Sequence, residues 1–135
     1  MASAEEEMNK LAYEAQYLQT QAQEMQRQLQ SAIMLQSEIE ATQKTIDGLK
    51  GLDDETYFQV GAGSFIRAKP SGEKGILVDI GAGVFMEKNP DDAKELLAKR
   101  SANITKAIES LKGTVEKINR RLQEIDMQAQ EMQSQ

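Results

Sequence analysis

Apolar residues recur at alternating intervals of three and four along the first part of the chain, over about residues 5–50. This spacing is the heptad pattern of a coiled-coil helix. Proline is absent from this stretch, and the glycines fall at its end, at Gly48 and Gly51. The pattern predicts a helix of about 65 Å. Its seam consists of Met8, Leu11, Ala15, Leu18, Ala22, Met25, Leu29, Ala32, Gln36, Ile39, Gln43 and Ile46.

A second helix is predicted over residues 90–133. Asn89 is a favourable N-cap and Pro90 suits the first helical position. The seam of this helix consists of Leu97, Ser101, Ile104, Ile108, Leu111, Val115, Ile118, Leu122, Ile125, Ala129 and Met132. Because the two helices have similar lengths, they are expected to pair as an antiparallel coiled coil, with Leu18 opposite Leu122 in the register that best matches large side chains with small ones.

The middle segment, residues 52–88, contains two copies of one unit, TYFQVGAGSFIRAK and GILVDIGAGVFMEK. Each copy has strand-forming residues on both sides of Gly-Ala-Gly, which predicts a β-hairpin, because glycine adopts positive φ without a steric penalty. The turn glycines are Gly61, Gly63, Gly81 and Gly83. The apolar strand residues are Phe58, Val60, Phe65, Ile66, Ile76, Val78, Ile80 and Phe85. Residues 70–75 form a turn between the copies. Isolated hairpins are barely stable, so strands from other subunits are expected to complete the sheet.

Composition limits the possible functions. Aromatic residues are 4% of the 135 residues, so a globular core of ordinary size is not expected. The net charge of −6 argues against binding nucleic acid. Cysteine and histidine are both absent, and no catalytic pair, cofactor site or metal site is predicted. The Gly-Ala-Gly motifs lack the third glycine of a dinucleotide loop and the Gly-Lys-Ser/Thr of a phosphate loop. Neither a signal peptide nor a membrane helix is predicted, which indicates a cytoplasmic protein.

The order of these elements resembles the α-class subunits of prefoldin, an archaeal-type chaperone family, over essentially the whole chain. VGAGSFIRA at residues 60–68 and VDIGAGVFMEKN at residues 78–89 are similar to the two hairpin signatures of the family, and KLAYEAQYLQTQAQ at residues 10–23 is similar to archaeal members. Phe58-Gln59 departs from the apolar-proline pair expected there.

The resemblance implies a single prefoldin-like domain over residues 1–135. Its fold is mostly α: a long antiparallel two-helix coiled coil with two small β-hairpins between the helices, and hairpins that join an intersubunit β-barrel. It also implies a hexamer of two α-class and four β-class subunits, which binds non-native polypeptides at the coiled-coil tips. The family passes these proteins to a group II chaperonin without using ATP.

The tip residues expected to bind unfolded proteins are Met8, Leu11, Tyr13, Tyr17, Leu18, Leu122, Ile125, Met127 and Met132. Most of them are seam positions, for which a purely structural role in the coiled coil is the simpler interpretation. Tyr13, Tyr17 and Met127 fall outside the seam, where they are either scattered surface residues or an adhesive patch. Met1 is expected at the same tip of the coiled coil. Flexible methionines suit contact with varied partners.

Other clusters are less informative. Ile33, Met34 and Leu35 are consecutive, so at least one leaves the seam; they meet a neighbouring subunit or cover a wide layer of the coil. Lys117, Arg120 and Arg121 lie among acidic residues, as on an ordinary helix surface. The first hypothesis is therefore a non-enzymatic holdase subunit. The alternative is a structural coiled-coil adaptor that binds one folded partner. Catalytic activity has almost no support.

Overall fold

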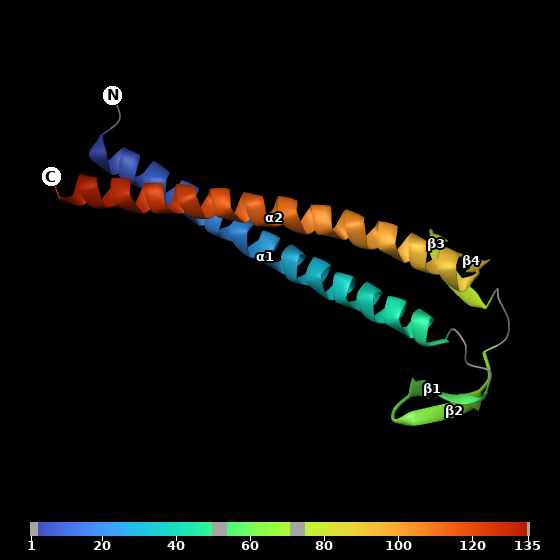
Figure 1. The fold of residues 1–135 in the computed structure, drawn as a ribbon. Coiled ribbons are helices and arrows are strands. Elements are labelled where there is room, and N and C mark those ends of the chain that lie inside the picture. Colours follow the sequence, from blue (N-terminus) through green and yellow to red (C-terminus); the bar gives the residue numbers. More distant parts are fainter. Residues whose placement is uncertain (1–2, 50–53, 71–74, 135) are drawn as a thin grey trace. The chain divides into compact units, whose positions relative to one another are not determined.

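In the computed structural model the chain forms two long helices with two β-hairpins between them (Figure 1). The structure describes residues 3–49, 54–70 and 75–134. Helix α1 spans Ala4–Leu49 and helix α2 spans Pro90–Gln133. These bounds compare with the ranges 5–50 and 90–133 expected from the heptad pattern; residue 50 lies outside the described residues.

Both helices begin at a capped residue. Asn89 Oδ1 accepts a hydrogen bond from the Asp92 amide at 2.8 Å, which satisfies one of the free N–H groups of the first turn of α2. Ser3 Oγ accepts one from the Glu6 amide at 3.2 Å at the start of α1. The N-cap predicted at Asn89 is thus confirmed, and Ser3 is a second cap that the heptad pattern did not indicate.

The chain divides into two compact units, one built from residues 1–35 and 104–135 and the other from residues 36–103. In the first unit α1 and α2 run antiparallel, so that the N- and C-termini lie at the same end (Figure 1). The seam positions predicted from the heptads are all buried or half-buried in both units. The most buried of them are Ile39, Ile46, Leu97, Ile108, Val115, Ile118 and Ile125. The predicted coiled-coil pattern is therefore confirmed.

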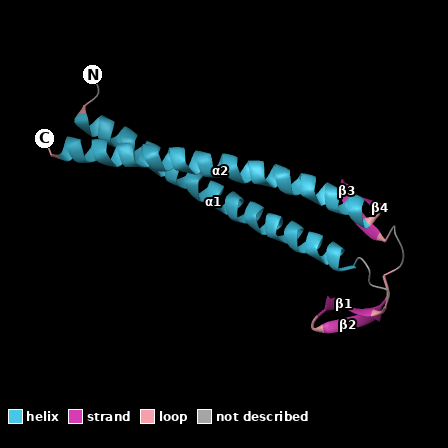
Figure 2. Ribbon diagram, in the orientation of Figure 1, coloured by secondary structure: helices cyan, strands magenta, loops and turns pink. Residues whose placement is uncertain are grey.

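The four strands form two separate two-stranded antiparallel sheets (Figure 2). Their bounds are β1 Thr56–Gly61, β2 Ser64–Ala68, β3 Ile76–Gly81 and β4 Val84–Lys88. Phe58 pairs with Ile66 in the first sheet, and Val78 pairs with Met86 in the second. The two hairpins predicted from the internal repeat are confirmed. The predicted turn over residues 70–75 falls largely on residues 71–74, which lie outside the described residues.

The two hairpin turns share one geometry. Ala62 and Gly63 have φ of 49° and 72°, and the equivalent Ala82 and Gly83 have 51° and 76°. Positive φ at both central residues matches the mirror-image turns that fit the twist of a β-hairpin. The pairing shifts before Gly61 and before Gly81, which marks a bulge in each first strand. The alanines therefore adopt the left-handed region as well, although sequence reasoning assigned positive φ to the glycines alone.

The second hairpin is attached to helix α2. The guanidinium of Arg100 donates a hydrogen bond to the backbone carbonyl of Asp79. The Asp79 side chain in turn accepts a hydrogen bond from the Gly81 amide at 2.8 Å, which fixes the start of the turn. Val78, next to this contact, is the one buried residue among the described strand positions. In the same unit Lys94 Nζ lies 2.6 Å from Asp47 Oδ1, so an ion pair joins α2 to α1.

Candidate functional site

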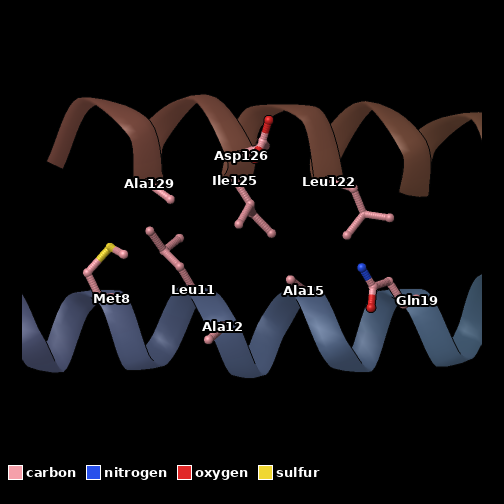
Figure 3. A pocket seen from close by; sticks show the side chains of 9 residues that line it. All are labelled: Met8, Leu11, Ala12, Ala15, Gln19, Leu122, Ile125, Asp126 and Ala129. Atoms are coloured by element: carbon pink, nitrogen blue, oxygen red, sulfur yellow. The ribbon is translucent and has the colours of Figure 1, made fainter. Parts of the chain in front are cut away.

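The coiled-coil tip, defined here as residues 3–19 of α1 and 121–134 of α2, contains an open groove between the helices (Figure 3). Its volume is about 390 Å³. Leu11, Ile125 and Leu122 extend into the space between the two helices, whereas the side chain of Asp126, which also lines the groove, lies along α2 and points away from α1 in this view. The full lining is Met8, Leu11, Ala12, Ala15, Gln19, Leu122, Ile125, Asp126 and Ala129. The groove is therefore mostly apolar and is open to solvent.

The groove lies where small residues line the space between the two helices. Ala15 lies opposite Ile125 and close to Leu122 (Figure 3), and its place opposite Ile125 agrees with the register that sets Leu18 against Leu122. Because alanine side chains are short, Ala12 and Ala15 leave space between the two helices, and this space is the groove. The structure brings four predicted tip residues together in this lining: Met8, Leu11, Leu122 and Ile125. Sequence reasoning missed Ala12, Gln19 and Asp126, because a heptad pattern alone does not show on which side of the seam the packing opens.

The remaining predicted tip residues lie elsewhere. Leu18 and Met132 are half-buried but do not line the groove. Tyr13 and Tyr17 are 74% and 62% exposed, and because they are four residues apart they share one face of α1. Met127 is 63% exposed on α2. The off-seam residues are thus solvent-exposed as predicted, but they occupy two different helices. Met1 lies outside the described residues.

An ion pair joins the two helices of the tip on the side of the seam opposite the groove. Arg121 Nε and a terminal guanidinium nitrogen of Arg121 donate to the two carboxylate oxygens of Glu14, at 2.7 and 2.9 Å. Arg121 also donates to Glu124 at 3.2 Å. The hydrogen bond from Arg121 lowers the pKa of Glu14 below its usual 4.5, and the bond to Glu14 raises the pKa of Arg121 further. Arg121 was interpreted from sequence as part of an ordinary basic surface; instead it joins the two helices.

The hairpins form a second exposed apolar surface. Val60, Phe65, Ile66, Ile80 and Phe85 are exposed, whereas Phe58 and Ile76 are half-buried and Val78 is buried. Further exposed apolar side chains, not singled out from the sequence, are Tyr57, Leu77, Val84 and Met86. Large apolar side chains exposed on this scale are typical of surfaces that bind other proteins.

Paired positions place these side chains on both faces of each hairpin. Phe65 pairs with Gln59 on one face of the first hairpin, and Ile66 pairs with Phe58 on the other. Phe85 pairs with Asp79, and Met86 with Val78, in the second. Because neither face is entirely polar, each hairpin presents apolar surface in two directions. This arrangement fits strands that are covered by partner subunits.

The described residues do not assemble a metal centre. They contain no group of three carboxylates that could hold a metal ion. The Gly-Ala-Gly segments form hairpin turns rather than helix-opening loops. Within the same part of the chain, neither helix has an apolar stretch long enough to cross a membrane.

Comparison with known proteins agrees with these elements. The family model described as Prefoldin subunit matches residues 18–135. Prefoldin subunit alpha of Pyrococcus horikoshii is 31% identical, in an alignment that covers 98% of this chain and 92% of that protein. The chain belongs to the prefoldin family, in its archaeal alpha class. Prefoldin subunit alpha of Methanosarcina barkeri is also 31% identical, over 96% of this chain and 94% of that protein.

A solved structure supports the fold independently of sequence. The cryo-EM structure of filamentous PFD from Methanocaldococcus jannaschii matches with a TM-score of 0.74, and the match covers 87% of this chain and 98% of that one. At 11% identity this likeness concerns the fold alone. Prefoldin subunits are non-enzymatic chaperone subunits that assemble with other prefoldin subunits, and membership of this family gives the present chain a chaperone-type function.

Proposed function

We propose that this prefoldin subunit is part of an ATP-independent holdase that binds unfolded proteins at its coiled-coil tips and transfers them to a group II chaperonin. The whole chain acts as one prefoldin-like domain, residues 1–135, and it works in the cytoplasm. Two copies combine with four β-class subunits in a hexamer. The apolar surfaces of the hairpins join an intersubunit β-barrel, and the tips project from it to hold non-native chains.

The observation that supports this proposal is that the chain carries two exposed apolar surfaces of different character, one on its hairpins and one at its tip. The hairpins are two-stranded sheets with exposed apolar side chains. The outer edge of each strand is available for permanent pairing with strands of other subunits. The tip combines an open apolar groove with exposed Tyr13, Tyr17 and Met127, which suits weak contact with many sequences. Several tips in one assembly would hold an unfolded chain by multivalency, although each contact is weak.

The Ile33–Leu35 cluster is assigned to neither surface. All three side chains of the cluster are exposed on α1. Of the two alternatives considered from the sequence, exposure argues against covering a wide layer of the coil, because a side chain that covers such a layer is itself largely buried against it. Contact with a neighbouring subunit therefore remains as the working hypothesis for this cluster.

A structural adaptor is the second candidate function. In that case the hairpins would act as dimerisation elements and the coiled coil would bind one folded partner. The ion pairs that join the helices, Glu14 with Arg121 and Asp47 with Lys94, would support such a role, because they favour one fixed arrangement of the helices. An adaptor would bind one partner to saturation and would ignore unfolded chains.

The deciding experiment mixes the protein with β-class prefoldin subunits and measures the mass of the complex by light scattering. The same complex is then tested for suppression of aggregation of a denatured protein after dilution, without nucleotide. A six-chain complex that suppresses aggregation supports the holdase. A homodimer with no effect on aggregation supports the adaptor.

A further inference from the structure

The tip groove carries a charge pattern that bears on which unfolded segments it binds. Over residues 3–19 and 121–134 seven carboxylates stand against two cations, which gives −5 out of the −6 of the whole chain. The carboxylates are Glu5, Glu6, Glu7, Glu14, Glu124, Asp126 and Glu131. Nearly all of the net charge of the protein therefore lies in the coiled-coil tip that contains the apolar groove.

The positive charges of the tip are confined to one side of the seam, whereas carboxylates lie on both sides. Asp126 lines the groove, and Glu5 lies on the same face of α1 as Met8 and Ala12, which follow it by three and seven residues. Both cations of the tip lie on the opposite side. Arg121 is held by Glu14, and Lys10 precedes Glu14 by four residues and so shares its face. The groove side thus presents Glu5, Asp126 and amides without a cation, whereas the ion-pair side holds both cations together with Glu14, Glu124 and other carboxylates.

We infer that the groove selects unfolded segments in which aliphatic side chains are flanked by lysine or arginine. This inference rests on the proposed holdase function and names the class of polypeptide that its tip prefers. The apolar lining accepts the aliphatic side chains, and about 390 Å³ is at the lower end of ligand-site volumes, so it accommodates a few side chains rather than a folded surface. Flanking cations meet Asp126 and the field of the neighbouring carboxylates, whereas flanking carboxylates are repelled.

Exposed charges of this kind affect selectivity more than total affinity. Asp126 is exposed, with only a long hydrogen bond of 3.4 Å from the Gln130 side chain. Its carboxylate is therefore available to a bound segment. Charge pairs at an open rim are weakened by salt, because the screening length falls from about 10 Å at 0.1 M to about 3 Å at 1 M. Preference for cationic segments should consequently be strong at low ionic strength and weak at high ionic strength.

The test uses three fluorescent peptides that share one aliphatic core and carry lysine, glutamine or glutamate on both sides. Binding to the full-length protein, assembled with its partner subunits, is measured by fluorescence anisotropy at low salt and at 1 M salt. At low salt the lysine-flanked peptide is expected to bind about tenfold more tightly than the glutamate-flanked one, with the glutamine-flanked peptide between them. At 1 M salt the three affinities should converge.

Two variants locate the effect. Asp126→Asn should reduce the difference between the lysine and glutamate peptides about threefold, since it removes the carboxylate at the groove rim without changing its size. Glu116→Gln removes an exposed carboxylate on α2 outside the groove, and it should leave the difference unchanged. An Asp126→Asn protein with undiminished preference would overturn the assignment to the groove.

The outcomes also separate this inference from the proposed function. Equal binding of the three peptides at low salt, with aggregation of a denatured protein still suppressed, would reject the charge preference and leave the holdase intact. Tighter binding of the glutamate-flanked peptide would reject it as well. If none of the peptides binds and aggregation is not suppressed, the holdase function itself fails, and the inference fails with it.

Discussion

Single residues decide the stability of this subunit at its backbone turns and between its helices. Glycine shows this most clearly, because the same residue type occurs in a helix and in two turns. Gly113 lies inside α2 with open space where a Cβ would be, whereas Gly63 and Gly83 have φ of 72° and 76°. Space is available around all three, so only backbone conformation distinguishes them.

Alanine substitution of these glycines should therefore have opposite effects. Gly113→Ala is expected to stabilise the protein by about 1 kcal/mol, because alanine is the better helix former and meets no other atom. Gly83→Ala is expected to destabilise the second hairpin by about 1–2 kcal/mol, because its left-handed conformation is unfavourable for a residue with a Cβ. Thermal unfolding of the two variants, followed by circular dichroism, checks both signs. Destabilisation by Gly113→Ala would mean that the surface of α2 around Gly113 contacts another chain.

The Glu14–Arg121 pair predicts a dependence of stability on pH. Because Arg121 lowers the pKa of Glu14 in the folded protein below its usual 4.5, the pair stabilises the fold above that value. This stabilisation is lost as the pH falls through the lowered pKa. Glu14→Gln should thus reduce the melting temperature by a few degrees at pH 7, and the difference from the unmodified protein should disappear in acid.

The matched control for this effect is Glu116→Gln, an exposed carboxylate of α2 on which no interhelical contact depends. It should leave the melting temperature at pH 7 nearly unchanged. A constant difference between Glu14→Gln and the unmodified protein from pH 7 down to strongly acidic pH would contradict the role of the ion pair.

At the scale of elements, the two hairpins are similar in sequence but differ in their attachment. Asp79 of β3 accepts hydrogen bonds at its carbonyl from Arg100 and at its side chain from Gly81. The equivalent position in the first hairpin is Gln59. A glutamine side chain is one methylene longer and does not favour the same short turn as aspartate. In that hairpin Arg67 instead donates to the Tyr57 hydroxyl at 2.9 Å and lies over its ring.

Removal of Arg100 should loosen the second hairpin alone. In an Arg100→Leu variant, amide hydrogens of β3 and β4 are expected to exchange faster with deuterium, whereas those of β1 and β2 keep their rates and serve as an internal reference. Lys99→Leu changes an exposed neighbour and should affect neither hairpin. Equal acceleration in both hairpins would show that Arg100 supports the sheet as a whole rather than the contact with Asp79.

At the scale of the whole molecule, the proposed division of labour assigns assembly to the hairpins and client binding to the tips. A charge on a hairpin should therefore act on assembly alone. Phe85→Asp is expected to split the oligomer, because a carboxylate at this exposed apolar position would be desolvated in a strand interface, while the helices remain folded. Light scattering and circular dichroism measure the two effects. Lys69→Glu, an exposed change of charge beyond β2, is the control.

Truncation of the tips should have the reverse result. A protein without residues 1–18 and 122–135 loses all of the groove lining except Gln19 but keeps both hairpins and the buried residues of the second unit. We expect it to assemble with partner subunits and to lose suppression of aggregation. Failure to assemble would show that the tips are structural, and retained suppression would place client binding elsewhere.

The sequence was sufficient for the periodic features of this protein. Heptad spacing predicted both helices, and every position that it placed on the seam is buried or half-buried, because a residue that repeats on one face of a helix is buried by any partner helix of the same period. The repeated Gly-Ala-Gly predicted both hairpins, because the turn constrains the backbone locally. These features depend on neighbours close in the chain.

Features that depend on which residues meet across the chain were decided only by the tertiary structure. The groove beside Ala12, the Glu14–Arg121 pair and the contact of Arg100 with the Asp79 carbonyl all join segments far apart in sequence. A heptad pattern places a residue on the seam but leaves open on which side two helices separate and which flanking charges face each other. Those choices follow from side-chain volumes and from the reach of long charged side chains once the helices are paired.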